Sequence, residues 1–310
     1  MLRIVVLGAA AGGGIPQWNC GCPVCRAARA DQPGLRSTQC SIALSADGDH
    51  WFLINASPDL RQQLLATKQL HPKAGQLRHS PITGVILCNG EVDAVAGLLS
   101  MREGSPFTIY AHPGVLSILK ANSIFNVLSE PNVKRQPIAI DEPFEPRLPD
   151  GRPSGIEILP FAVPGKVAWY LRDRSLPGGR GDEIGDTIGL RIRDKATDKH
   201  VFFLAACAHV SDDLKARLAG AALVFFDGTV WRDDEMITSG LGQKRGQDMG
   251  HIAMSGTDGA IESLAGLAID RKLFLHVNNS NPALLANSEE RKVLERAGWQ
   301  IPADGMEIVL

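Results

Sequence analysis

Three cysteines near the start of the chain have the spacing of a metal site. They are Cys20, Cys22 and Cys25, in the run Cys-Gly-Cys-Pro-Val-Cys. Thiolates suit structural zinc, and the intervening glycine and proline favour the tight turn that lets three sulfurs converge. The alternative is a turn with free thiols. A thiolate site without an open position would be structural rather than catalytic, and its fourth ligand must come from elsewhere, because no other Cys or His lies nearby.

A second group of metal-binding residue types is spread over the rest of the chain. Glu91 and Asp93 follow an apolar run and open a predicted helix, where carboxylates also serve as simple caps. Asp227 follows another apolar run, and His251 and His276 lie in a predicted loop and at a predicted strand end. Two histidines with Asp93 make the 2-His-1-carboxylate set of non-haem iron(II), with Glu91 and Asp227 as further oxygen donors. The alternative for each histidine is a buried residue that donates to a carbonyl.

The glycine-rich stretch Gly8–Gly14 follows the first predicted strand. It matches neither the G-x-G-x-x-G spacing nor the Walker spacing with its lysine, and Pro16 interrupts the place where a helix should begin. We therefore interpret it as a tight turn at the exit of a strand.

Composition excludes several classes of protein. The 310 residues are 44% hydrophobic and 21% charged, which is ordinary for a soluble globular chain. The net charge of -2 offers no basic excess for a nucleic-acid backbone, so no nucleic-acid partner is expected. No run reaches the roughly 18 apolar residues of a membrane helix, and the apolar stretch 4–11 is too short for a signal peptide. We expect a cytoplasmic protein with no membrane partner.

Elements that could position these residues alternate along the chain. Short β-branched runs predict strands, and apolar residues at helical spacing predict helices. The predicted strands are Leu2–Leu7, Ser41–Leu44, Trp51–Asn55, Gly84–Cys88, Phe107–Tyr110, Thr187–Arg193, His200–Ala205, Ala222–Phe226 and Leu273–Val277. Between the fifth and sixth of these, a stretch that resembles a meander with long loops contains two short strand-like pieces, Ile156–Leu159 and Val167–Leu171. The predicted helices are Pro58–Ala66, Val92–Met101, Val115–Leu128 with a break near Asn122, Ser211–Leu218, Ile261–Ile269 and Ser288–Ala297. This rhythm favours two similar α/β layers, stacked as helix, sheet, sheet, helix.

Three of the predicted strands end in polar residues. The runs that begin at Trp51, Val224 and Leu273 lead into Asn55, Asp227 and His276. In layered α/β proteins such strand ends collect functional sites, because the sheet fixes the backbone while polar groups emerge at its lip. We therefore expect the second group of residues to meet at one edge of the sheets.

Taken together, these residues resemble the metallo-β-lactamase fold family and, within it, the branch that acts in pyrroloquinoline quinone (PQQ) biosynthesis. The segments that carry the resemblance are Val5–Gly14, Pro16–Cys20, Asn55–Arg61, Asp227–Thr229, Met249–His251 and His276–Pro282. The resemblance implies an α/β fold, a four-layer αββα sandwich formed as one domain over residues 1–310. It also implies a metal cleft at the lip of the two sheets and a separate zinc held by the three cysteines, as in phosphodiesterases of the PhnP family.

The resemblance also assigns the metal motif position by position. The family motif His-x-His-x-Asp-His falls on Asn89, Glu91, Asp93 and Ala94, and the PQQ branch already lacks the first two histidines. Ala94 departs from that branch, which has a histidine there, so cleft metal binding should be weakened. The departure is either drift toward a binding role or a change that disables the cleft. The fourth zinc ligand of PhnP-like proteins falls on Asn279, whose amide oxygen is a weak donor.

Two further family positions have lost their ligands. The histidine of the third family motif falls near Gly165, and the aspartate that bridges two zinc ions falls near Ala206. A dizinc hydrolase needs a hydroxide held between two metal ions, so these losses disfavour hydrolysis.

The resemblance implies an enzyme that binds one iron(II) in the cleft and hydroxylates the tyrosine of a PQQ precursor peptide or of its cross-linked Glu-Tyr fragment. Asp93, His251 and His276 would be ligands, Glu91 a fourth donor or base, and Asp227 would orient an imidazole. Its partners would be that small-molecule or short-peptide precursor and other proteins of the pathway.

Two alternatives remain at this stage. One is a non-catalytic carrier that binds PQQ or its precursor and escorts it to the periplasm. In that case Arg3, Arg61, Arg102 or Lys166 would pair with the carboxylates of the ligand. The other alternative is a degenerate hydrolase of the same fold.

Overall fold

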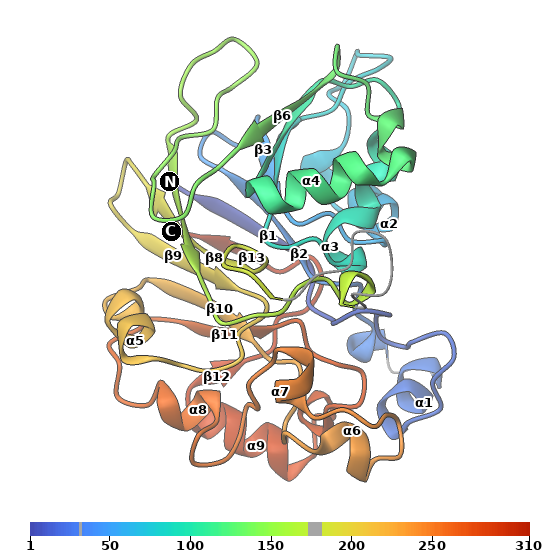
Figure 1. Ribbon diagram of the computed structural model, residues 1–310, viewed down its shortest axis with the longest axis vertical. Coiled ribbons are helices and arrows are strands. Elements are labelled where there is room, and N and C mark those ends of the chain that lie inside the picture. The colour runs from blue at the N-terminus through green and yellow to red at the C-terminus, as the bar shows by residue number, and fades with distance from the viewer. Residues whose placement is uncertain (31–32, 173–181) are drawn as a thin grey trace.

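The computed structural model describes residues 1–30, 33–172 and 182–310 (Figure 1). Within these residues two mixed β-sheets lie face to face, and helices cover their outer faces. None of the described helices is long and apolar enough to span a membrane.

The first sheet has seven strands in the described chain. Their order is β13 (Glu307–Val309), β1 (Arg3–Gly8), β2 (Ser41–Ser45), β3 (Trp51–Ile54), β4 (Ile82–Leu87), β5 (Phe107–Ala111) and β6 (Val133–Pro137). The pairs from β13 to β3 are antiparallel, and those from β3 to β6 are parallel. The last strand of the chain thus completes the sheet that β1 begins.

The second sheet has six strands in the described chain. Their order is β12 (Trp299–Gln300), β11 (Lys272–Leu275), β10 (Leu223–Asp227), β9 (His200–Leu204), β8 (Ile188–Asp194) and β7 (Ile156–Ala162). β7, β8 and β9 are antiparallel neighbours, whereas β9 to β12 run parallel. The carboxyl ends of β10 and β11 therefore reach the same edge of the sheet.

Short helices connect the strands. The α-helices are α1 (Pro23–Arg29), α2 (Leu60–Ala66), α3 (Val92–Val95), α4 (Pro113–Ala121), α5 (Asp212–Leu218), α6 (Glu235–Thr238), α7 (Gly246–Met249), α8 (Ala260–Ser263) and α9 (Glu289–Arg296). The 3-10 turns are η1 (Pro33–Leu35), η2 (Lys68–Leu70), η3 (Ala96–Met101), η4 (Ser123–Val127), η5 (Trp169–Leu171) and η6 (Pro282–Leu284). Serine side chains cap α5 and α9, each followed by two acidic residues that suit a helix N-terminus.

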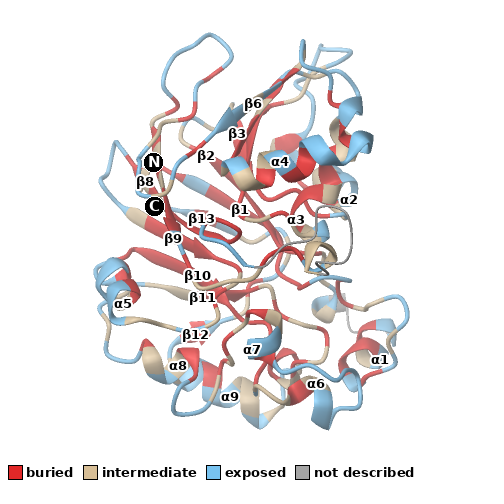
Figure 2. Ribbon diagram, viewed as in Figure 1, coloured by how far each residue is buried: buried red, intermediate tan, exposed pale blue. Residues whose placement is uncertain are grey.

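Three clusters of buried side chains confirm the four-layer αββα sandwich (Figure 2). Along β1, Ile4 and Val6 face the second sheet, while Val5 and Leu7 pack toward the helices of the first layer. The strands of the second sheet alternate in the same way, so Phe225 lies between the sheets and its neighbours pack on α5, α8 and α9. Each sheet is therefore buried on both faces, which explains its nearly continuous apolar strands.

Two predicted elements are wrong. Val167–Leu171 is not a strand, because the Trp169 N–H donates to a side chain and the Leu171 N–H closes the 3-10 turn η5. The helix expected over Ile261–Ile269 is only the short α8, and Gly266 adopts a φ of +74° within the predicted range. The predicted break near Asn122 is confirmed, since α4 ends at Ala121 and η4 follows.

Candidate functional site

Polar residues at the strand ends line one cavity of about 420 Å³ at the edge of the two sheets. Asn55 follows β3 and His276 follows β11, and both have positive φ angles of 60° and 56°. This conformation is uncommon for residues other than glycine and is concentrated at functional sites. The Asn55 Oδ1 accepts a hydrogen bond from the N–H of Cys88 at 2.9 Å, which fastens the end of β3 to the end of β4.

Asp227 lies behind the cavity at the end of β10 and is fully buried. Its Oδ1 accepts hydrogen bonds from the N–H and hydroxyl of Thr229, at 3.0 and 2.7 Å. Its Oδ2 accepts from the N–H of Cys207 at 2.9 Å and lies 2.7 Å from Nδ1 of His251. Because both oxygens are occupied, Asp227 is placed to orient His251 rather than to face the cavity.

The Thr229 hydroxyl joins the two histidines. Its Oγ1 lies 3.1 Å from Nδ1 of His251 and 2.9 Å from Nδ1 of His276. The two imidazole rings stack with centroids 5.0 Å apart. Thr229 belongs to a segment that carries the family resemblance, but its sequence position alone gave it no role in the site.

The other side of the His276 ring faces Asp93. Its Nε2 lies 2.9 Å from the Asp93 Oδ2, so these two atoms share either a proton or a cation. Burial alone would lower the pKa of His276, but the hydrogen bond and charge of Asp93 raise it. Burial would raise the pKa of Asp93, whereas the hydrogen bond and charge of His276 hold it below the ordinary value.

Glu91 precedes α3 and lies beside Asp93 in the cavity wall. Its Oε1 accepts the Trp169 N–H at 2.9 Å. Burial, together with the charge of Asp93, raises the pKa of Glu91 to about 7. Ala94 also lines the cavity, is 2% exposed, and offers only a methyl group where a ligand would stand.

The cavity therefore brings together Asp93, Glu91, His251 and His276. Asp227, His251 and His276 also each offer a ligand atom, and these three atoms lie within 4.8 Å of one another. This donor set of carboxylate oxygens and imidazole nitrogens fits a divalent transition metal. The bonds to the two Asp227 oxygens favour Asp93 as the carboxylate that faces such an ion.

The glycine-rich stretch forms the turn that its spacing predicts. Gly13 and Gly14 have positive φ angles, and a Cβ at Gly12 would lie 3.6 Å from the Asp93 Oδ2. Gly12 therefore lies against the metal motif. Of the basic residues considered for ligand binding, Lys166 lines the cavity, whereas Arg3, Arg61 and Arg102 are not among its lining residues.

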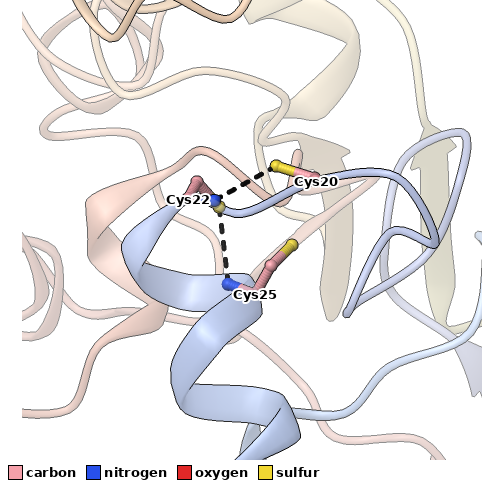
Figure 3. Close-up of side chains that lie close together, drawn as sticks. All are labelled: Cys20, Cys22 and Cys25. Atoms are coloured by element: carbon pink, nitrogen blue, oxygen red, sulfur yellow. Dashed lines mark hydrogen bonds between the residues drawn. The ribbon is translucent and has the colours of Figure 1, made fainter.

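The three cysteines converge as their spacing predicts (Figure 3). Cys20 and Cys22 precede α1, and Cys25 lies in its first turn, which Pro23 opens. The Sγ atoms lie within 4.8 Å of one another. The sequence analysis did not predict α1, and it is this helix that turns Cys25 back toward Cys22.

Asn279 closes the cysteine cluster from the far end of the chain. Its Nδ2 lies 3.1 Å from Sγ of Cys20, 3.6 Å from that of Cys22 and 3.3 Å from that of Cys25. Rotation of the amide by half a turn exchanges its oxygen and nitrogen, so the oxygen can occupy the same place. Asn279 thus stands where the resemblance put a fourth ligand.

The pKa values of the two buried cysteines are shifted in opposite directions. Burial would raise the pKa of Cys22, but hydrogen bonds from the Cys25 N–H and from neighbouring side chains lower it. Burial and the neighbouring thiols raise the pKa of Cys25 to about 11. Three thiolates this close together repel one another, so they all ionise only when a cation such as zinc offsets their charge.

Comparison with known proteins gives consistent matches over the whole chain. Residues 50–277 match a family model described as a beta-lactamase superfamily domain. Coenzyme PQQ synthesis protein B of Bradyrhizobium diazoefficiens is 73% identical over 310 residues, which is 100% of both chains. The protein with the same name from Gluconacetobacter diazotrophicus is 54% identical over 99% of both chains.

Solved structures agree in fold. The crystal structure of Zn²⁺-bound PqqB from Methylobacterium extorquens has a TM-score of 0.92 and 49% identity, covering 99% of this chain and 100% of that one. A diphosphatase of the PhnP family has a TM-score of 0.65 at 20% identity, covering 99% of this chain and 96% of that one. At this identity the second likeness concerns the fold alone.

Proposed function

Because the chain belongs to the coenzyme PQQ synthesis protein B family of the β-lactamase superfamily, we propose that it hydroxylates a tyrosine-derived precursor of PQQ. The reaction would use iron(II) in the cleft, dioxygen and an external two-electron reductant. One oxygen atom would enter the tyrosine ring and the other would leave as water. The substrate would be the precursor peptide or its cross-linked Glu-Tyr fragment.

The observation that supports this proposal most is the pairing of Asp93 and His276. A carboxylate oxygen and an imidazole nitrogen 2.9 Å apart at a cavity surface can hold one cation between them. His251 lines the same cavity, and together these three residues would supply the 2-His-1-carboxylate set that is typical of iron(II) oxygenases. Iron(II) bound by this set would supply the activation of dioxygen.

The chain's own residues would prepare the site. Asp227 accepts from Nδ1 of His251, which leaves Nε2 of that ring as the nitrogen free to act as a ligand. Glu91, with its pKa raised to about 7, could accept the proton of the tyrosine phenol near neutral pH. The cavity of about 420 Å³ has room for a tyrosine-sized group beside these residues.

Two-metal hydrolysis is supported less well. Asn89, Gly165 and Ala206 stand where the resemblance places ligands of the first metal ion and the bridging aspartate. Two of these side chains carry no donor atom, so a hydroxide held between two ions lacks its usual support.

One observation favours a second candidate, a carrier that binds PQQ or its precursor without chemistry. Ala94 leaves the cleft one ligand short of the family motif, and its methyl group lines the cavity. A ligand could then be held by the cavity alone. This reading needs no metal in the cleft.

The test is to titrate the full chain with iron(II) without oxygen and then to add tyrosine substrate, reductant and oxygen. The proposal expects about one iron per cleft and a product heavier by one oxygen atom in mass spectrometry. An Asp93→Asn variant should lose both the cleft iron and the oxygenated product. Asp49→Asn, in an exposed loop, should keep both. Wild-type protein that binds no iron in the cleft would refute the proposal and leave the carrier reading.

A further inference from the structure

The lining of the cavity carries two acidic and three basic side chains from the described residues. Glu91 and Asp93 belong to the metal motif, while Lys166, Arg172 and Lys244 come from other segments. Lys244 is exposed, so it lies where the cavity opens, and Lys166 and Arg172 are half-buried. The cavity therefore presents positive charge beyond the acidic metal motif.

Within the described residues these cations have few partners. Neither Lys166 nor Lys244 forms an ion pair with a carboxylate in the described part of the chain. Arg172 donates to the Asp248 carbonyl at 3.3 Å and lies 3.9 Å from the Asp182 carboxylate. Among the described residues, the pair with Asp182 is too long for a charge-assisted hydrogen bond, so it occupies little of the guanidinium.

Lys166 is held in place by its neighbours. Gly250 has a φ of +92°, and a Cβ there would lie only 2.8 Å from the Lys166 Cγ. The aliphatic stem of Lys166 therefore packs against the Gly250 backbone, next to His251. Thr187 fixes the backbone by donating from its hydroxyl to the Lys166 carbonyl at 3.3 Å.

Trp169 adds an aromatic surface to the same wall. Its backbone is fastened because its N–H donates to Glu91, and the adjacent Tyr170 hydroxyl donates to the Gly90 carbonyl at 2.6 Å. Trp169 nevertheless lines the cavity and is 66% exposed. An indole on an anchored turn with a free face is suited to stack on a planar ring.

We propose that Lys166, Trp169 and Arg172 determine specificity for an aromatic ligand that carries several carboxylates. The ring would stack on Trp169, and the carboxylates would pair with the cations, Lys244 included. This arrangement would direct the reacting ring toward Asp93 and His276. The inference rests on the proposed role in PQQ biosynthesis but requires no metal and no catalysis.

The test uses PQQ, an aromatic quinone with three carboxylates, and its trimethyl ester as probes of the full chain. Binding is measured by calorimetry and by quenching of tryptophan fluorescence. Lys166→Met and Arg172→Met should each weaken PQQ binding about 10-fold, the usual size of one charge-assisted hydrogen bond. Trp169→Leu should weaken it about 5-fold and remove most of the quenching.

Matched controls come from two exposed arginines outside the cavity lining, changed as Arg61→Gln and Arg102→Gln. These variants should bind PQQ as the wild type does, and the ester should bind all variants weakly and equally. Wild-type protein that does not bind PQQ would overturn the inference, as would equal losses in the control and cavity variants. Oxygenation that persists without PQQ binding would overturn this inference alone and leave the proposed function intact.

Discussion

Asp227 and His251 form a buried pair in which the carboxylate Oδ2 lies 2.7 Å from the imidazole Nδ1. This contact fixes the ring and decides which of its nitrogens is free. Since Asp227 also binds the backbone N–H groups of Cys207 and Thr229, it ties the ends of three chain segments to one side chain. The orientation of His251 is therefore built into the sheet rather than into the loop that carries it.

Replacing the Asp227 carboxylate should weaken the binding of iron(II) in the cleft. In Asp227→Asn the amide loses one of the two acceptor oxygens, so His251 loses its fixed orientation. We expect cleft iron(II) affinity to fall by about 10- to 100-fold, the usual cost of losing a group that orients a ligand. Anaerobic calorimetry measures this, with Asp212→Asn, whose side chain is 98% exposed, as the control. Unchanged affinity would show that His251 is not a ligand.

Restoring a ligand at position 94 should strengthen the binding of iron(II) in the cleft. Ala94→His adds an imidazole to the cavity wall beside Asp93, so iron(II) affinity should rise by about 10- to 100-fold and tyrosine oxygenation should increase. Ala94→Leu adds comparable bulk without a donor atom and should give neither gain. If Ala94→His raises neither iron(II) affinity nor tyrosine oxygenation, the oxygenase hypothesis fails and the carrier hypothesis takes its place.

Removing one thiol should empty the cysteine cluster. Wild-type protein purified without chelator should contain about one zinc per chain from this cluster, and Cys22→Ser should lose both zinc and solubility. Cys207→Ser is the control, because the Cys207 Sγ only donates to the His209 carbonyl and a serine hydroxyl can do the same. Elemental analysis decides the matter, and zinc retained in Cys22→Ser would mean that the cysteines are not the ligands.

Asp194 should make stability depend on pH below neutrality. Its side chain is 1% exposed, and it accepts hydrogen bonds from the Leu2 N–H, the Ala196 N–H and the Thr197 hydroxyl. Burial would raise the pKa of Asp194, but these hydrogen bonds lower it. Because the folded pKa lies below the unfolded value of about 3.9, the stabilisation is complete above about pH 4 and is lost as the pH falls further.

Asp194→Asn should therefore lower the free energy of unfolding by about 1–3 kcal/mol at pH 7. The difference from wild type should shrink as the pH falls below about 4. Urea unfolding at several pH values measures both effects, and Asp150→Asn on an exposed loop should match the wild type throughout. A deficit that stays constant down to pH 2 would contradict the assignment.

The sequence predicted the layers of the fold well because buried strands here are apolar on both faces. β10, with Leu223–Phe226, is an example, since no polar alternation obscures the run. Three strands were missed. β13 is three residues long and pairs with β1 across the whole chain, and β12 has two residues. β6 is an edge strand beside β5 whose residues Lys134, Arg135 and Gln136 give it no apolar run. Local pattern carries little signal for such short edge strands.

The sequence predicted which residue types form the candidate site, but not the hydrogen bonds that join them. Strand ends pointed to Asp227 and His276, and the cysteine spacing pointed to the cluster. The roles of Thr229, which touches both histidines, and of Trp169, which binds Glu91, were not predicted, because they depend on contacts between segments far apart in the chain. Single-sequence reasoning cannot rank a threonine or a tryptophan by contacts that only the fold creates.

The segment from His276 to Asn279 joins the cleft to the cysteine cluster within three peptide bonds. The Val277 N–H donates to Ala9, and its carbonyl accepts from Ala11, so the segment is clamped between its two ends. If loading one site shifts this backbone, we expect the affinity of the other site to change. Thermodynamic reciprocity then requires that each site change the metal affinity of the other by the same factor. The two sites would fill either cooperatively or in competition, and the affinity measured at one site would depend on whether the other is occupied.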